Sequence, residues 1–108
     1  NGKPYIVAGT PGGTTIPTSV FQTMMNMLEF GMSAEDAVNK PKFHHQHLPD
    51  EVYVEKTFSV EIRKQLEAMG YKITERAPIG KTEVIRITGK GKIEVAADKR
   101  GDDSVAGY

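Results

Sequence analysis

The chain has 108 residues, enough for one domain with a modest core but not for two domains. Its 14 basic and 14 acidic residues balance and are interspersed, so the charge pattern gives no reason to expect nucleic acid or an anionic membrane as a partner. The absence of cysteine excludes disulfides and thiol chemistry, and no apolar run approaches the ~18 residues that a membrane span requires.

The chain opens with a predicted strand followed by a predicted helix. Residues 3–9 (KPYIVAG) combine an aromatic residue with β-branched residues and end at a glycine, which is typical of a strand. From Pro17 onward, apolar residues recur every three or four positions. This spacing predicts an amphipathic helix over residues 17–30, ended by Gly31.

A second helix is predicted from its capping signal. Ser33 is followed three residues later by Asp36, an acidic variant of the capping box that begins many helices. This helix is expected to end before Pro41, because a residue that precedes proline avoids helical geometry. Residues 42–50 (KFHHQHLPD) show no period, and we expect an ordered loop there.

The second half of the chain combines strands with one helix. Residues 59–69 predict a helix closed by Gly70. Alternating residues predict strands over residues 51–56, 71–77, 83–88 and 92–98. The last two strands flank a glycine-rich turn (GKG), which favours a hairpin. The tail GDDSVAGY is expected to run along the surface, and the whole pattern predicts a layered α+β fold.

Two adjacent glycines, Gly12 and Gly13, lie between the first predicted strand and the first predicted helix. The first turn of a helix leaves N–H groups without partners and favours negative charge, and glycines let the main chain approach a ligand. Two neighbouring N–H donors aimed at one negative oxygen suit acyl transfer, in which a tetrahedral intermediate forms. A carboxylate or phosphate would fit the same geometry, and a plain strand-to-helix turn is a further alternative.

Three histidines, His44, His45 and His47, lie within four positions. Adjacent residues of an extended chain point to opposite faces, so at most His45 and His47 could share an ion. Asp50 is the nearest carboxylate, and a zinc site needs three or four convergent ligands. We therefore expect no metal and a structural role for the histidines, through hydrogen bonds in their loop.

Other reactive residue types have a structural interpretation. Asp102 and Asp103 could form an acid/base pair, but adjacent carboxylates usually form a solvated turn. No base stands beside any of the threonines near the glycines, and helix capping is the commoner use of that residue type. Those threonines are Thr10, Thr14, Thr15 and Thr18. The methionines, three of them in residues 24–27, favour core filling over a binding surface.

Several stretches, in this order, resemble the carboxy-terminal part of the small subunit of bacterial γ-glutamyltranspeptidases. They are VAGTPGGTTIPTSVFQ, FGMSAEDAV, PKFHHQHLPDEVYVEK, AMGYKI and ADKRGDDSVAGY, of which GTPGG and FHHQHLPDE are the most specific. The resemblance runs over essentially the whole chain. It implies that residues 1–108 form a single incomplete domain within a four-layer αββα sandwich of the N-terminal-nucleophile hydrolase type.

The resemblance also implies an activity. Members of this family transfer the γ-glutamyl group of glutathione-like amides to water, amino acids or peptides, after the precursor has cleaved itself to expose a nucleophilic threonine. The backbone N–H groups of Gly12 and Gly13 are implied to bind substrate as the oxyanion hole, with no cofactor and no metal. The nucleophile, a serine-rich substrate motif and the arginine that holds the glutamate carboxylate lie outside this chain, which is therefore expected to be inactive alone.

The implied partners are the remainder of the small subunit and the large subunit, and the implied location is periplasmic or secreted. A start at Asn1 and a hydrophobic fraction of 38% agree with a chain that other parts complete, so we expect exposed apolar strand faces, above all at residues 3–9. Thr10 and Lys99 replace a serine and a proline common in the family, without touching the backbone donors. The alternatives are part of a related N-terminal-nucleophile acylase and a non-catalytic carboxylate-binding module.

Overall fold

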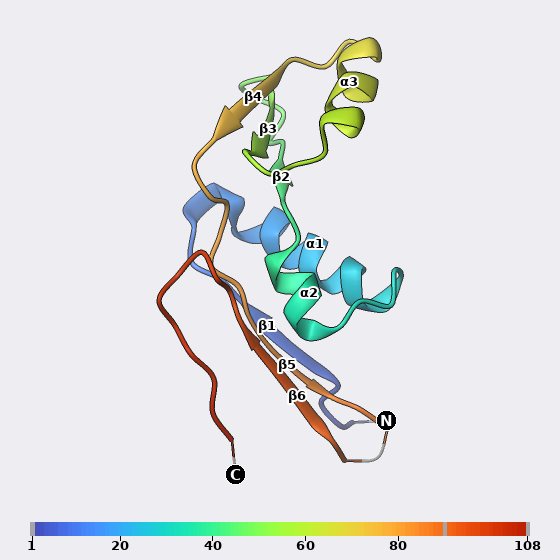
Figure 1. Ribbon diagram of the computed structural model, residues 1–108, viewed down its shortest axis with the longest axis vertical. Helices are drawn as coiled ribbons and strands as arrows, with labels where there is room; N and C mark the ends of the chain where they lie inside the picture. The colour runs from blue at the N-terminus through green and yellow to red at the C-terminus, as the bar shows by residue number, and fades with distance from the viewer. Residues whose placement is uncertain (1, 90, 108) are drawn as a thin grey trace.

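The computed structural model describes residues 2–89 and 91–107, which form two three-stranded sheets and three α-helices. The molecule is elongated, measuring 47 × 27 × 23 Å, with one sheet and two helices in the larger part and the second sheet beyond them (Figure 1). This arrangement confirms the α+β class that the sequence predicts.

The first sheet is antiparallel and has the strand order β1-β5-β6. Its strands are β1 (Ile6–Gly9), β5 (Glu83–Ile87) and β6 (Ile93–Ala97). The predicted pairing of the last two strands is confirmed, because Ile85 lies opposite Val95 and Ile87 opposite Ile93. Lys90, in the predicted GKG turn, lies outside the described residues.

The second sheet has the order β2-β3-β4 and carries a βαβ unit. Strand β3 (Val52–Glu55) pairs in parallel with β4 (Ile73–Arg76), and α3 (Val60–Ala68) connects them. Strand β2 (Phe43–His44) pairs antiparallel with β3 inside the segment predicted to be an ordered loop, so that prediction was wrong at these two residues. A strand of two residues is too short to produce a period in the sequence.

Helices α1 (Ile16–Leu28) and α2 (Ala34–Asn39) cover one face of the first sheet (Figure 1). The Oγ of Ser33 accepts a hydrogen bond from the N–H of Asp36 at 3.1 Å, so the predicted capping signal is confirmed. Apolar residues of both helices meet the inner face of the sheet and form the core. The buried members of this core are Met27, Ala34, Ala37, Val38, Val84 and Ala96.

The buried side of α1 is mostly polar, contrary to what its apolar spacing indicates. Its buried residues are Ser19, Gln22, Thr23 and Met27. Phe21 and Leu28, which belong to the apolar stripe, are 61% and 49% exposed. Gln22 tolerates burial because its amide pairs with the backbone of β2, accepting from the Phe43 N–H at 3.0 Å and donating to the Phe43 carbonyl at 2.7 Å.

The other face of the first sheet is apolar and exposed. Val7 is 58% exposed, although it lies directly opposite Ile85 on the neighbouring strand. Val7, Ile85, Val95 and the tail residue Val105 line a shallow groove on this face. The apolar strand surface expected for residues 3–9 is therefore present.

Candidate functional site

The turn between β1 and α1 has a backbone conformation that suits glycine. Gly12 has φ 143° and Gly13 has φ 60°, both in the region that side chains rarely adopt. A Cβ at Gly12 would lie 2.5 Å from Thr15 Oγ1, whereas a Cβ at Gly13 would meet no atom within 4 Å. Conformation and packing both require glycine at position 12, and conformation alone requires it at position 13.

The same turn presents main-chain donors. A single 3-10 turn, η1 (Gly13–Thr15), precedes α1, and the Gly12 carbonyl accepts from the Thr15 N–H at 3.2 Å and from Thr15 Oγ1 at 2.8 Å. Within residues 2–89 and 91–107, neither the Gly12 N–H nor the Gly13 N–H donates a hydrogen bond, and both residues are exposed. Two neighbouring donors at the start of a helix favour a negatively charged oxygen.

The segment that precedes β5 packs against this turn. Thr10 Oγ1 accepts a hydrogen bond from the Lys81 N–H at 2.7 Å and donates to the Pro11 carbonyl at 2.8 Å. Gly80 has φ +74°, and a Cβ there would lie 2.8 Å from Ser19 Oγ and 2.9 Å from Thr10 Oγ1. The glycine therefore allows a close approach that fixes the position of Thr10.

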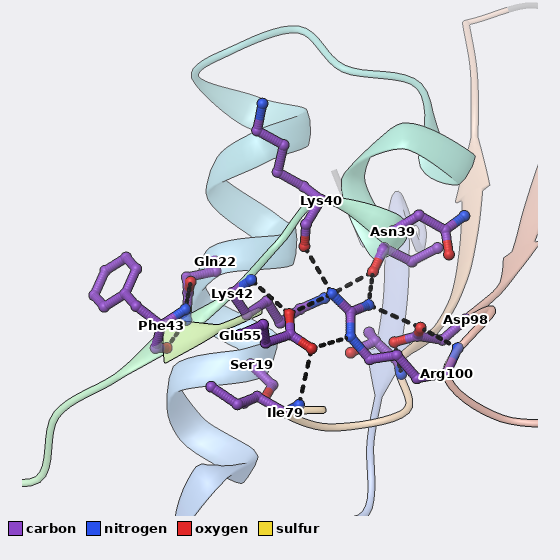
Figure 2. A network of polar contacts seen from close by, with 12 residues as sticks. Ser19, Gln22, Asn39, Lys40, Lys42, Phe43, Glu55, Ile79, Asp98 and Arg100 are labelled. Atoms are coloured by element: carbon purple, nitrogen blue, oxygen red, sulfur yellow. Dashed lines mark hydrogen bonds and ion pairs between the residues drawn. The ribbon is translucent and has the colours of Figure 1, made fainter. Parts of the chain in front are cut away.

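A buried ionic network lies between the two sheets (Figure 2). Arg100 Nε and Nη2 donate to the two oxygens of Glu55 at 2.6 and 2.5 Å, and its Nη1 donates to Asp98 Oδ1 at 2.8 Å. Burial by itself raises the pKa of Glu55, but hydrogen bonds from Arg100 and from two backbone N–H groups outweigh it and lower that pKa. Burial by itself lowers the pKa of Arg100, but the hydrogen bonds and charges of Glu55 and Asp98 have the larger effect, so the pKa of Arg100 is raised.

Lys42 is completely buried beside this network. Its Nζ donates to the Val38 carbonyl at 2.7 Å. Burial, followed by the positive charge of Arg100, lowers the pKa of Lys42 to about 8, although Asp98 and Glu55 act in the opposite direction. None of these charged residues is conspicuous in the sequence, because nothing in their local spacing distinguishes a buried charge from a solvated one.

The histidines make contacts within their own region. His44 is buried, with Nδ1 2.7 Å from Thr18 Oγ1 and Nε2 2.8 Å from Gln46 Oε1. His45 Nε2 lies 3.1 Å from Asp50 Oδ1. These contacts agree with the structural role predicted for both residues, whereas the described part of the chain shows no side-chain hydrogen bond for His47. In the same part, no three His, Asp or Glu side chains gather in a way that could hold a metal ion.

The threonines do not cap α1 as predicted. Thr15 occupies the N-cap position without a side-chain cap hydrogen bond, and its hydroxyl instead donates to the Gly12 carbonyl. Thr18 Oγ1 donates to the Thr15 carbonyl at 3.1 Å. The Thr15 hydroxyl thus contacts the glycine turn and does not cap the helix, and the Thr18 hydroxyl bonds to the backbone three residues back. Thr14 is exposed, and so are Asp102 and Asp103 in the tail.

The fold and the turn together define a class: an α+β layer whose strand-to-helix turn exposes two neighbouring glycine N–H groups. The sequence profile described as gamma-glutamyltranspeptidase matches residues 1–108, and the chain belongs to that family. It is 43% identical over 109 residues to the glutathione hydrolase proenzyme of Escherichia coli K12, an alignment that covers 100% of this chain and 19% of that protein. The glutathione hydrolase proenzyme of Pseudomonas aeruginosa is 38% identical over 105 residues, which cover 94% of this chain and 19% of the relative.

Solved structures give the same assignment of fold. The γ-glutamyltranspeptidase from Pseudomonas nitroreducens superposes with a TM-score of 0.92 at 34% identity, covering 100% of this chain and 57% of that one. The cephalosporin acylase from Bacillus halodurans gives a TM-score of 0.92 at 28% identity, covering 100% of this chain and 21% of that one. These matches confirm the N-terminal-nucleophile hydrolase fold expected from the sequence. The chain spans about a fifth of the length of the curated relatives named above.

No helix in the part of the chain that the structure describes is both long and apolar enough to cross a membrane.

Proposed function

We propose that this chain is the part of a γ-glutamyltransferase that carries the oxyanion-hole turn. The complete enzyme transfers the γ-glutamyl group of glutathione-like amides to water, amino acids or peptides through an acyl-threonine intermediate. Membership of the family and the similarity to proteins named glutathione hydrolase proenzyme support this proposal. The family resemblance assigns the nucleophilic threonine to another part of the protein, so the chain alone is inactive.

One observation carries the proposal: the N–H groups of Gly12 and Gly13 lack partners within the described residues and stand side by side in the sequence at the start of a helix. When threonine attacks the γ-carbonyl, the carbonyl oxygen becomes negative, and these two N–H groups donate to it. Donors held in place before the reaction stabilise the transition state without reorganising. Losing one such donor reduces kcat by about 10²–10³.

The remaining parts of the enzyme would cover the apolar surface of this chain. The exposed face of the first sheet, with Val7 and Ile85, suits a second sheet packed against it, as in the αββα sandwich that the resemblance implies. Phe21 and Leu28 on the outer side of α1 would meet further parts of the same enzyme. The proposed partners are thus the remainder of the small subunit and the large subunit.

The match to a cephalosporin acylase favours a second candidate, an amide acylase in which the same turn serves a different acyl group. Both candidates use the turn in the same way and differ in substrate. Release of glutamate or cysteinylglycine from glutathione by the full-length protein would favour the first candidate, and turnover of only non-glutamyl amides would favour the second.

The test of the site uses the full-length, self-cleaved protein with Gly12→Val and Gly13→Pro substitutions. Both variants should lower kcat far more than they raise KM, because the interaction they remove forms mainly in the transition state. Self-cleavage is measured separately by gel electrophoresis, since an unprocessed precursor would lose activity for another reason. A processed, folded variant with nearly normal kcat would show that the glycines only form a turn.

A further inference from the structure

We propose that the buried Glu55–Arg100–Asp98 network positions the oxyanion turn, acting through residues 79–82 and the Thr10 hydroxyl. The inference rests on the proposed function of Gly12 and Gly13. In this proposal Glu55, Arg100 and Asp98 are positioning residues for the γ-glutamyl transfer, because they act through the turn and not directly on the substrate.

The network holds residues 79–82 at both ends. Glu55 Oε2 accepts a hydrogen bond from the Ile79 N–H at 3.0 Å, and Asp98 Oδ2 accepts one from the Thr82 N–H at 2.9 Å. Arg100 joins the two carboxylates, as Figure 2 shows. Because each carboxylate binds both the guanidinium and one backbone N–H of this segment, the spacing of the two carboxylates fixes the position of residues 79–82.

The middle of that segment contacts the turn. The Lys81 N–H donates to Thr10 Oγ1 at 2.7 Å, and this hydroxyl donates onward to the carbonyl of Pro11, the residue directly before Gly12. Gly80 lies so close that a Cβ there would be 2.9 Å from Thr10 Oγ1. Thr10 is therefore in contact with the segment on one side and with the turn on the other.

The directional hydrogen bonds of the network suit a positioning role. Glu55 and Asp98 are 5% and 1% exposed, and their charges are satisfied by hydrogen bonds from Arg100 and from backbone N–H groups, which hold these groups in fixed positions. Arg100 also donates to the carbonyls of Val38 at 2.8 Å and Lys40 at 3.0 Å, at the end of α2. One guanidinium thus fixes the ends of β3, β6 and α2 relative to residues 79–82. A displacement of about 1 Å in a catalytic group can cost about 10²-fold in rate.

The connecting hydroxyl gives the first test, in the full-length, self-cleaved enzyme. Thr10→Val keeps the branched shape and removes the hydrogen bonds, and we expect kcat to fall about 10-fold with KM changed less than about two-fold. Thr10→Ser keeps the hydroxyl and should retain nearly all of the activity. A normal kcat in Thr10→Val, or an equal loss in both variants, would overturn the inference.

The second test asks whether Glu55 acts through Thr10. Glu55→Gln should lower kcat, and the double variant Glu55→Gln/Thr10→Val should be no slower than the slower single variant, because both changes interrupt one path. Losses of kcat that multiply would show that Glu55 acts independently of Thr10. If Glu55→Gln does not fold, Asp98→Asn takes its place in the same cycle.

The matched control is the Arg86–Glu94 pair, which joins β5 to β6 with its side chains partly buried. Glu94 also accepts a hydrogen bond from the Ala34 N–H, and within the described residues the pair makes no hydrogen bond to residues 79–82. Glu94→Gln should lower the melting temperature without lowering kcat, and a loss of kcat like that of Glu55→Gln would overturn the inference. The outcome for Gly12 and Gly13 separates the two proposals. If glycine variants lose kcat while Thr10→Val does not, the positioning network fails and the oxyanion turn stands. If the glycine variants keep kcat, the proposed function itself fails.

Discussion

Alanine substitutions at the two glycines should have unequal effects on catalysis. At Gly13, φ is 60° and the space beyond the Cβ is open, so Gly13→Ala costs only the left-handed backbone conformation, about 1–2 kcal/mol. At Gly12, φ is 143°, and the added Cβ would lie 2.5 Å from Thr15 Oγ1. The turn or Thr15 must therefore move, and a moved turn misdirects the N–H groups.

The expected difference follows from what each variant keeps. Gly13→Ala retains both donors near their positions, and we expect kcat to fall by no more than about 10-fold. Gly12→Ala displaces a donor, and we expect a loss of about 10²–10³ in kcat, equivalent to about 2.7–4 kcal/mol of transition-state stabilisation. The measurement is steady-state kcat and KM of self-cleaved, full-length enzyme on a γ-glutamyl amide.

A second substitution tests whether the contact with Thr15 is the cause. Thr15→Ala removes the Oγ1 that the new Cβ would meet, so the double variant Gly12→Ala/Thr15→Ala should recover part of the activity lost in Gly12→Ala. The single variant Thr15→Ala is the control for losing the hydrogen bond to the Gly12 carbonyl. Equal losses for Gly12→Ala and Gly13→Ala, or no recovery in the double variant, would refute this reasoning.

Three further predictions concern the rest of the chain. Burial lowers the pKa of Lys42 to about 8, so between pH 8 and 10.5 this residue binds fewer protons in the folded protein than in the unfolded protein. Its contribution to the free energy of unfolding therefore rises with pH in that window. Lys42→Met should flatten that rise and raise the melting temperature of the full-length protein at pH 7. Chelator-washed full-length protein should contain no stoichiometric zinc or nickel by mass spectrometry, and His45→Ala/His47→Ala should not change its metal content; stoichiometric metal lost in that variant would contradict the structural role. Val7→Glu, on the exposed face of the first sheet, should lower the yield of assembled, self-cleaved enzyme because it places a charge where a second sheet is expected, and a normal yield would contradict that packing.

Features encoded by neighbouring residues could be predicted from the sequence. The Ser33 cap depends on a residue three positions away, and the β5–β6 hairpin depends on alternation around a short glycine-rich turn. The glycine pair was identifiable for the same reason, since its neighbours already indicate a strand followed by a helix. Each of these signals lies within one element or one turn.

Features that depend on distant residues could not be predicted in this way. Glu55 and Arg100 are 45 residues apart in the sequence, and Thr10 and Lys81 are 71 apart. The buried side of α1 was misjudged for a related reason. The apolar spacing of α1 predicts a helix packed against apolar neighbours. In the described residues, Gln22 on the buried side pairs with the backbone of β2.

The candidate site combines a feature encoded by neighbouring residues with contacts between residues that are distant in the sequence. Gly12 and Gly13 supply the N–H donors and adopt φ values of 143° and 60°. Glycine is also the residue that loses the most conformational freedom on folding. Something outside the turn must therefore restrict it, and the described contacts supply one route, from Thr10 through residues 79–82 to the two buried carboxylates. The directional hydrogen bonds of a buried ion network suit the task of fixing a flexible turn. The conformational freedom that lets the turn approach a substrate is thus the reason that it needs distant charged residues to hold it.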